Sequence, residues 1–250
     1  MPVDMLPISP AIPRRALVTG GGERSGRAVV LGLAQAGFDV AIHDRTSRAG
    51  AEDILHAVRA LGRTGCVLQA DFMREEQVQA LYGQASQALG GPLGVLVNNA
   101  ATCEQDAWDD ASLESWMRHM KPNLRAPFVL IQAFAKGLPQ GARGMVLNML
   151  DEHVWPLSPH FVSHTVSRTA LWTLTQTMAQ ALAPKGIRVN AVGIAPASPL
   201  PCPGQMQEQS VRAILALLAQ PFVTGQMLSL NDGQHLQWSA APWAGHAVEE

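Results

Sequence analysis

The stretch at residues 15–27 constrains the fold more than any other part of the sequence. It begins with a short apolar run at residues 16–18, which predicts a buried strand. Polar and glycine residues interrupt the run at residues 19–22, and apolar residues then recur at helical spacing over residues 28–36. A second strand is predicted at residues 38–43, so the unit closes within about 30 residues. The sequence therefore predicts two parallel strands joined by a glycine turn and a helix.

The glycine turn of this unit suits a phosphate group. Glycine adopts positive φ easily and lets a ligand approach the backbone closely. The free N–H groups at the start of the following helix, together with the helix dipole, favour an anion there. Glycine-rich turns also occur as plain connectors, but the strands on both sides are what a dinucleotide-binding motif requires. We therefore expect residues 19–26 to hold the phosphates of a dinucleotide.

Helices and strands alternate along the rest of the chain. Helices are predicted at residues 48–61, 75–89, 112–120, 124–137, 160–183 and 211–219, and strands at residues 65–71, 94–100, 144–150, 187–192 and 226–231. We expect a bend or break in the helical region 112–137 at Pro122 and Pro127. The alternation predicts an α/β fold, a single doubly wound Rossmann domain with a parallel sheet of about seven strands and helices on both faces.

Composition limits the class of protein and its partners. The 250 residues suffice for one large domain, and a net charge of −2 provides no basic field for nucleic acid. Three widely spaced cysteines argue against a disulfide framework and fit the cytoplasm. No apolar run reaches the roughly 18 residues of a membrane span. We expect a flexible leader at residues 1–13, the domain at 14–237 and a tail at 238–250.

Several motifs then occur in a consistent order. They are Thr19 to Gly26, Asp71, Asn98-Asn-Ala-Ala101, Asn123, and Arg188-Val-Asn-Ala-Val before Pro196. Together they resemble the motifs of the short-chain dehydrogenase/reductase family over nearly the whole chain. Arg24, in place of the middle glycine of the first motif, is characteristic of the pteridine reductase branch. The resemblance implies binding of a nicotinamide dinucleotide and an oxidoreductase activity.

The residues that we expect to bind the cofactor come from these motifs and from the end of the second strand. They are Thr19, Gly20, Gly22, Arg24, Ser25, Gly26, Asp44, Arg45, Ser47, Asp71, Asn98, Ala100, Arg168 and Pro196. Asp44 lies where an acidic group accepts hydrogen bonds from the ribose 2′-OH of NAD. Arg24, Arg45 and Ser47 crowd the same place and suit a 2′-phosphate. We favour NADP(H) over NAD(H) because Arg24 lies inside the phosphate loop.

The catalytic stretch departs from the family pattern. The family has Ser, then Tyr thirteen residues later and Lys four residues after that, and the corresponding residues here are Asp151, His164 and Arg168. An aspartate in the first of these positions is a feature of the pteridine reductase branch, where it takes part in protonating the pterin. Asn123 matches the family's catalytic asparagine, which holds a water in the proton relay.

Two of these substitutions define a hypothesis for the site. Residues four apart on a helix share a face, so Arg168 disfavours the charged form of His164, and Asp151, if close, offsets this effect. Histidine is a suitable acid or base near neutral pH. We therefore expect Asp151 and His164 to form the proton relay and Arg168 to hold the cofactor ribose.

The sequence predicts an NAD(P)(H)-dependent reductase that transfers hydride to a C=N or C=O bond of a small planar substrate, with a pterin as one candidate. An alternative is a catalytically silent protein of the same fold that binds nucleotide or a protein partner. A zinc site formed by His160, His164, Asp151 and His153 is less favoured. The short, proline-rich segment 197–210 predicts an open substrate pocket. The family resemblance implies a homotetramer or homodimer, paired through the helices at 124–137 and 160–183.

Overall fold

The computed structural model describes residues 7–22, 24–45, 48–151, 154–155, 157–194 and 203–230. Its centre is a parallel sheet of seven strands in the order β3-β2-β1-β4-β5-β6-β7. The strands are β1 (Arg15–Thr19), β2 (Asp39–Asp44), β3 (Gly65–Gln69), β4 (Val95–Asn98), β5 (Gly144–Asp151), β6 (Ile187–Ile194) and β7 (Met227–Leu230). The chain reverses its direction of travel across the sheet between β1 and β4, and a ligand crevice is expected at the carboxyl ends there.

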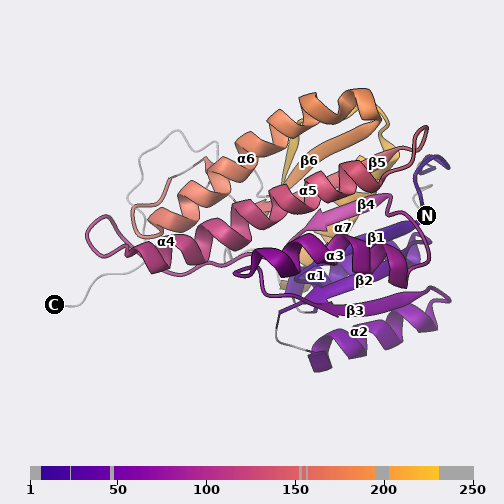
Figure 1. Ribbon diagram of the computed structural model, residues 1–250, viewed down its shortest axis with the longest axis horizontal. Helices are drawn as coiled ribbons and strands as arrows, with labels where there is room; N and C mark the ends of the chain where they lie inside the picture. The colour runs from indigo at the N-terminus through magenta and orange to yellow at the C-terminus, as the bar shows by residue number, and fades with distance from the viewer. Residues whose placement is uncertain are drawn as a thin grey trace.

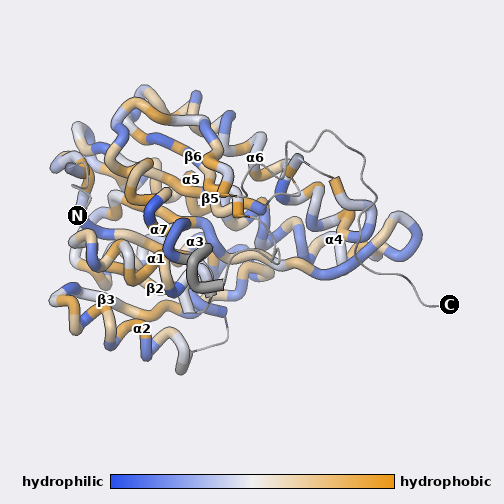
Figure 2. Tube along the Cα trace, turned by 180° about the vertical axis from the view of Figure 1, so that it is seen from behind, coloured by the Kyte–Doolittle hydropathy of each residue, from blue (hydrophilic) through white to orange (hydrophobic). Residues whose placement is uncertain are grey.

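Helices cover both faces of this sheet, as predicted (Figure 1). They are α1 (Arg24–Gln35), α2 (Arg48–Ala60), α3 (Glu75–Ala88), α4 (Leu113–Met120), α5 (Ala126–Gly137), α6 (Val162–Leu182) and α7 (Pro203–Ala219). Helices α1, α2 and α7 share one apolar core with the sheet, and α3, α5 and α6 share the other. Figure 2 shows the strands as largely apolar bands between these layers. The architecture is the doubly wound Rossmann domain that the sequence predicts.

The side chains of each central strand alternate between the two cores. In β1, Ala16 and Val18 join the core that contains α1, and Leu17 between them joins the core that contains α3. All three are fully buried. A parallel strand covered on both faces needs apolar residues at every position, which is why these strands appear in the sequence as continuous apolar runs.

Two features differ from the sequence-based predictions, and a third refines one of them. Ile8 and Ile12 are buried in the first core, so residues 7–13 belong to the domain and are not a flexible leader. The α-helix is interrupted at Pro122, as predicted, by a π-helical turn at Lys121–Arg125 that joins α4 to α5. Pro127 is tolerated because it lies in the first turn of α5. Helix α7 begins at Pro203, eight residues before the predicted start at residue 211. The tail at 238–250 lies outside the described residues.

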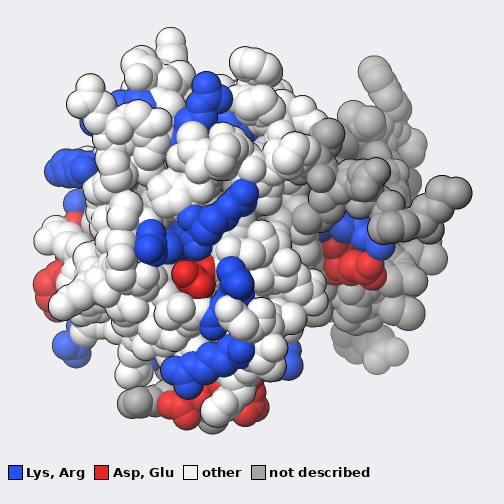
Figure 3. Space-filling view, turned by 90° about the vertical axis from the view of Figure 1, so that its right-hand side faces the viewer, with Lys and Arg blue, Asp and Glu red and all other residues white. Residues whose placement is uncertain are grey.

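Basic side chains gather at the amino ends of the strands, which Figure 3 shows face on. Lys136, Arg143 and Lys185 line a hollow of about 490 Å³ there. Lys136 and Lys185 lie in the last turns of helical segments, where a cation complements the negative end of the helix dipole. This end of the sheet is opposite the predicted site. Within the described part of the chain, no helix is long and apolar enough to cross a membrane.

Candidate active site

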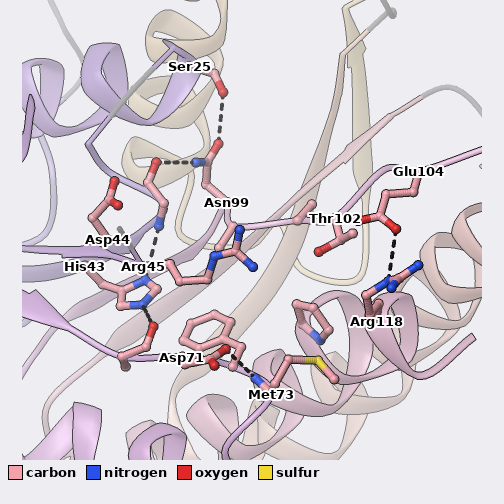
Figure 4. Close-up of a pocket in the computed structure, with 16 residues that line it drawn as sticks. Ser25, His43, Asp44, Arg45, Asp71, Met73, Asn99, Thr102, Glu104 and Arg118 are labelled. Carbon is pink, nitrogen blue, oxygen red and sulfur yellow. Dashed lines mark hydrogen bonds and ion pairs between the residues drawn. The ribbon is translucent and has the colours of Figure 1, made fainter. Parts of the chain in front are cut away.

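A cleft of about 410 Å³ opens at the carboxyl ends of β1, β2 and β4 (Figure 4). It lies at the point where the strand order reverses, as expected for a dinucleotide site. Its lining residues are Gly20, Ser25, His43, Asp44, Arg45, Ala70, Asp71, Phe72, Met73, Asn99, Ala100, Ala101, Thr102, Glu104, Arg118 and Pro122. Six of the residues predicted to bind the cofactor are among them.

The glycine turn is too compact for side chains at its key positions. Gly20 has φ of +60°, and a Cβ atom on Gly26 would lie 1.9 Å from the Gly20 carbonyl oxygen. A Cβ atom on Gly22 would lie 2.0 Å from Oδ2 of Asp44. The turn therefore brings backbone, the start of α1 and the end of β2 together at the cleft. This cradle fits the phosphates of a dinucleotide. Ser47, Pro196 and the side chain of Arg24 lie outside the described residues.

The two neighbouring asparagines at the end of β4 have different surroundings. Asn99 lines the cleft, and its Nδ2 atom donates to the carbonyl oxygens of Thr19 at 3.1 Å and Gly20 at 2.9 Å. Its Oδ1 atom accepts a hydrogen bond from Ser25 Oγ at 3.0 Å. Asn99 therefore ties the glycine turn to β4. Asn98 was predicted from the sequence to bind the cofactor and Asn99 was not, although both belong to the same motif.

Asn98 lies behind the cleft and supports the sheet. It is buried, and its Nδ2 atom donates to Oδ1 of Asn148 on β5 at 2.8 Å. Asn148 in turn donates to Thr175 Oγ1 on α6 at 2.8 Å. Thr19 Oγ1 accepts hydrogen bonds from the backbone N–H groups of Asn99 at 2.9 Å and Ala100 at 3.0 Å. This network fixes the carboxyl ends of β1, β4 and β5 in register.

One wall of the cleft is an aromatic stack that was not predicted from the sequence. The rings of His43 and Phe72 are parallel, with their centroids 4.4 Å apart. His43 Nε2 donates to the Ala70 carbonyl at 3.0 Å, and Nδ1 accepts from the Gly20 N–H at 3.3 Å. These partners fix a neutral ring, and burial lowers the pKa of His43. Asp71, beside this stack, accepts the N–H of Met73 at 3.0 Å.

The predicted catalytic residues meet at the end of β5 and the start of α6. His164 Nε2 lies 2.7 Å from Oδ2 of Asp151, and Arg168 Nε lies 3.3 Å from the same oxygen. The Arg168 side chain also donates to the carbonyl of Met149. Arg168 is not among the residues that line the dinucleotide cleft, and its contact with the cofactor ribose stays a prediction. The three side chains form one compact charged cluster.

The partners of His164 fix its charge. Nδ1 lies 3.0 Å from the Thr102 carbonyl, so both ring nitrogens face acceptors and both carry hydrogen. Burial lowers the pKa of His164, but the hydrogen bonds with Asp151 and with the Cys103 thiol, the charge of Asp151 and the Thr102 carbonyl outweigh this effect and raise it to about 9. Burial also lowers the pKa of Arg168, and Asp151 opposes that shift.

Asn123 holds the backbone of Thr102, whose carbonyl faces His164. Its Oδ1 atom accepts the Thr102 N–H at 2.7 Å, and its Nδ2 atom donates to the Thr102 carbonyl at 2.9 Å and to Ser167 Oγ at 2.9 Å. Asn123 is fully buried in the π-helical turn. In this arrangement the side chain positions the oxygen that faces His164, a role that the sequence does not reveal.

Among the residues considered for zinc, those that the structure describes do not assemble into a ligand set. Both ring nitrogens of His164 are directed at protein acceptors. Across the described part of the chain, no three His, Cys, Asp or Glu side chains are grouped so that they could hold a metal ion. His153 lies outside the described residues.

Comparison with known proteins gives the family. A sequence profile for short chain dehydrogenases matches residues 14–200. A short-chain dehydrogenase/reductase of Armillaria gallica is 35% identical over 185 residues, which cover 73% of this chain and 70% of the relative. Among solved structures, the FolM alternative dihydrofolate reductase 1 of Brucella canis, complexed with NADP, has a TM-score of 0.84 and 36% identity and covers 94% of this chain and 100% of its own.

The homologous FolM protein from Brucella suis, also in complex with NADP, has a TM-score of 0.81 and 39% identity, and the match covers 90% of this chain and 96% of the neighbour. The range matched by the family profile includes the residues of the cleft and of the charged cluster described above. The chain therefore belongs to the short-chain dehydrogenase/reductase family.

Proposed function

We propose that this protein is an NADP(H)-dependent reductase that transfers hydride to a C=N or C=O bond of a small planar substrate, with dihydropterins as the first class to test. The observation that carries the proposal is the Asp151–His164 pair at the carboxyl end of β5, on the same edge of the sheet as the dinucleotide cleft. The two NADP-bound FolM structures support the substrate class. The pair provides a proton donor, and the cleft provides the cofactor site.

The preference for NADP(H) rests on the end of β2. Arg45 is exposed and lines the cleft, so its guanidinium is available to a 2′-phosphate. The Asp44 carboxylate lies against Gly22, whose added Cβ atom would lie 2.0 Å from it. An acidic group beside the turn also suits the 2′-hydroxyl of NAD. We therefore expect both cofactors to bind and NADPH to bind more tightly.

The charged cluster can carry the proton that reduction requires. The bound nicotinamide would supply the hydride, and the reduced substrate atom then needs a proton. The Asp151 side chain is 22% exposed, whereas that of His164 is only 4% exposed, so we assign the substrate-facing role to Asp151. A proton on His164 Nε2 passes to Asp151 Oδ2 and from there to the substrate nitrogen or oxygen. Arg168 holds Asp151 in place and favours its ionised form between turnovers.

The competing function is a silent protein of the same fold, and one observation favours it. We take His164 and Arg168 to occupy the Tyr and Lys positions of the family. The Arg168 guanidinium faces Asp151 and Met149, so the lysine's contact with the nicotinamide ribose has no counterpart among the residues that line the cleft. Such a protein would bind the dinucleotide without transferring hydride.

Calorimetry and steady-state kinetics separate these functions. Titration of the full-length protein with NADPH and NADH measures cofactor binding, and oxidation of NADPH with dihydropterins, quinones and ketones measures activity. Binding together with turnover of at least one substrate supports the reductase. Binding without turnover, in both the parent and His164→Tyr, supports the silent protein. Absence of binding of either cofactor at millimolar concentration contradicts the reductase and leaves a silent protein that binds a protein partner. Much tighter NADH binding overturns the preference for NADP(H).

A further inference from the structure

A second buried histidine lies beside the proton-transfer cluster. His119, near the end of α4, is fully buried, and its ring centroid is 6.1 Å from that of His164 at an interplanar angle of 75°. It was not among the residues selected from the sequence, and it does not line the dinucleotide cleft. Its position, in direct contact with the ring that carries the proton, requires an explanation.

The hydrogen-bond partners of His119 fix its protonation state. Nδ1 lies 2.9 Å from the carbonyl of Ser115, which can only accept, so Nδ1 carries hydrogen. Nε2 lies 3.0 Å from the backbone nitrogen of Glu104, whose N–H can only donate, so Nε2 carries a lone pair. The ring is therefore neutral. The adjacent ring of His164 faces two acceptors and is charged, so the two neighbouring histidines are held in opposite states.

His119 also fixes the segment that supplies an acceptor to His164. We call residues 102–106 the strap. Asn123 clamps its first residue, Thr102, and the Asp106 carboxylate at its end accepts from Ser115 Oγ at 2.8 Å and from the Ser163 N–H at 3.0 Å. Between these two anchors, the Glu104 N–H donates to His119 and the Glu104 carboxylate pairs with Arg118, so both contacts join the middle of the strap to α4.

We propose that His119 is a positioning residue of the proton-transfer site, which holds the strap and the ring of His164 through its neutral Nδ1–H form. Loss of the Nε2 acceptor leaves the Glu104 N–H without this partner and loosens the carbonyl of Thr102 two residues before it. The effect on turnover rests on the reductase function proposed above. The effect on the ionisation of His164 does not depend on that function.

The groups that face His164 come from four elements. They are Asp151 from β5, Arg168 from α6 itself, Thr102 and Cys103 from the strap, and His119 from α4. Asp151 pairs with Arg168, and Arg168 also donates to the Met149 carbonyl of β5. A change at His119 therefore reaches His164 through the strap and through direct contact of the rings.

Two substitutions distinguish the bond that His119 makes to Glu104 from the bond that it makes to Ser115. In His119→Gln, the longer side chain brings its carboxamide oxygen close to the position of Nε2, so the bond to Glu104 survives. In His119→Asn, the shorter carboxamide reaches only the position of Nδ1, so the bond to Glu104 is lost. The experiment follows the titration of His164 by NMR in the full-length, cofactor-free protein. We expect a midpoint near pH 9 in the parent and in His119→Gln, and one lower by about half a pH unit or more in His119→Asn.

Arg118→Gln is the matched control. It removes the surface ion pair between Arg118 Nε and Glu104 Oε2, at 3.0 Å, and leaves the backbone bond to His119 in place. The titration of His164 should then stay at the parent value. An unchanged midpoint in His119→Asn, or an equal shift in Arg118→Gln, overturns the proposal. A nitrogen spectrum of the parent that places hydrogen on Nε2 of His119 overturns it too, even if His119→Asn does not fold.

Kinetics connect the inference to the reaction. We expect His119→Asn to lower kcat while the calorimetric Kd for NADPH stays unchanged, and His119→Gln to restore kcat. If His164 shifts as expected but neither the parent nor any variant turns over a substrate, the positioning role stands and the reductase function fails. If the parent turns over a substrate and the titration of His164 is unaffected by His119→Asn, the positioning role fails and the reductase function stands.

Discussion

His164 and Asp151 share a hydrogen bond of 2.7 Å although thirteen residues separate them in the chain. Asp151 is the last residue of β5 and His164 lies in the first turn of α6. The connection between the strand and the helix therefore brings the two side chains together. The carboxylate thereby offsets the burial of the imidazole. His164 keeps its charge at a pH where an exposed histidine is neutral, because its pKa rises to about 9.

The pH dependence of turnover should reflect this raised pKa. The sequence alone predicts an essential group that titrates near neutral pH, as an unperturbed histidine does. A raised pKa keeps the protonated donor present below about pH 9 and removes it as the pH rises further. We therefore expect kcat to be constant from pH 6.5 to 8 and to fall above pH 9. A rate that already falls near pH 6.5 would show that the bond with Asp151 does not support the imidazolium.

Removal of the imidazole should separate catalysis from cofactor binding. We expect His164→Phe to lower turnover by roughly 10²–10⁴-fold, the usual share of general acid–base catalysis. The dissociation constant for NADPH should hardly change, because His164 does not line the dinucleotide cleft. His164→Tyr is the control, and we expect it to retain activity, since a phenol is the family's residue at this position. If His164→Phe is as fast as the parent, the proton comes from Asp151 or from water.

Arg168 should contribute more to stability than to cofactor binding. Its side chain is 5% exposed and pairs with Asp151, so removal of the guanidinium leaves a partly buried carboxylate with His164 as its partner. Breaking such a pair costs about 3–5 kcal/mol, and we expect Arg168→Leu to lie near the lower end because Asp151 is 22% exposed. Urea denaturation measures the difference. Arg168→Lys keeps the charge but lacks the planar guanidinium, so its free energy of unfolding should fall by less than that of Arg168→Leu. Equal stability of all three proteins would contradict this assignment.

An apolar hollow on the outer face of α4, α5 and α6 suits a second copy of the chain, as the family resemblance implies. It is lined by Phe72, Met73, Glu75, Met117, Met120, Lys121, Leu124, Arg125, Phe128 and Leu174. We expect the parent to form a dimer or tetramer and Phe128→Glu to shift it to a 26.7 kDa monomer in light scattering. Leu61→Glu alters an apolar residue that is 42% exposed on another face and should leave the oligomer intact. A monomeric parent would contradict the expectation.

The sequence predicts this fold well because the signals for it are local. Strands such as β1, which are covered on both faces, appear in the sequence as continuous apolar runs. The glycine turn with Gly20 and Gly26 predicts the position of the cleft. The 13-residue spacing from Asp151 to His164 likewise reflects one strand–helix connection. Side-chain direction is not local, so the sequence did not reveal that the Arg168 guanidinium turns to the Met149 carbonyl.

The role of His119 was hidden for a different reason. Its two partners are backbone groups, the Ser115 carbonyl and the Glu104 N–H. Nearly every residue type has these groups, so the sequence does not indicate which of them His119 binds. The stack of His43 on Phe72 joins the end of β2 to the turn that follows β3, and no motif relates the two residues. Long-range geometry of this kind depends on how the elements pack, which residue patterns do not specify.

The π-helical turn at Lys121–Arg125 lies between α4 and α5. It lets the side chains of α4 and α5 point in directions that an uninterrupted α-helix would not allow. Each residue advances an α-helix by about 100°, so an insertion inside an uninterrupted helix re-aims every side chain beyond it. A wider turn absorbs an extra residue locally. His119 on α4 can therefore face His164 while Leu130 and Phe134 on α5 remain directed at the sheet. Loss of one residue within Lys121–Arg125 would turn one of the two helices away from the residues that it faces.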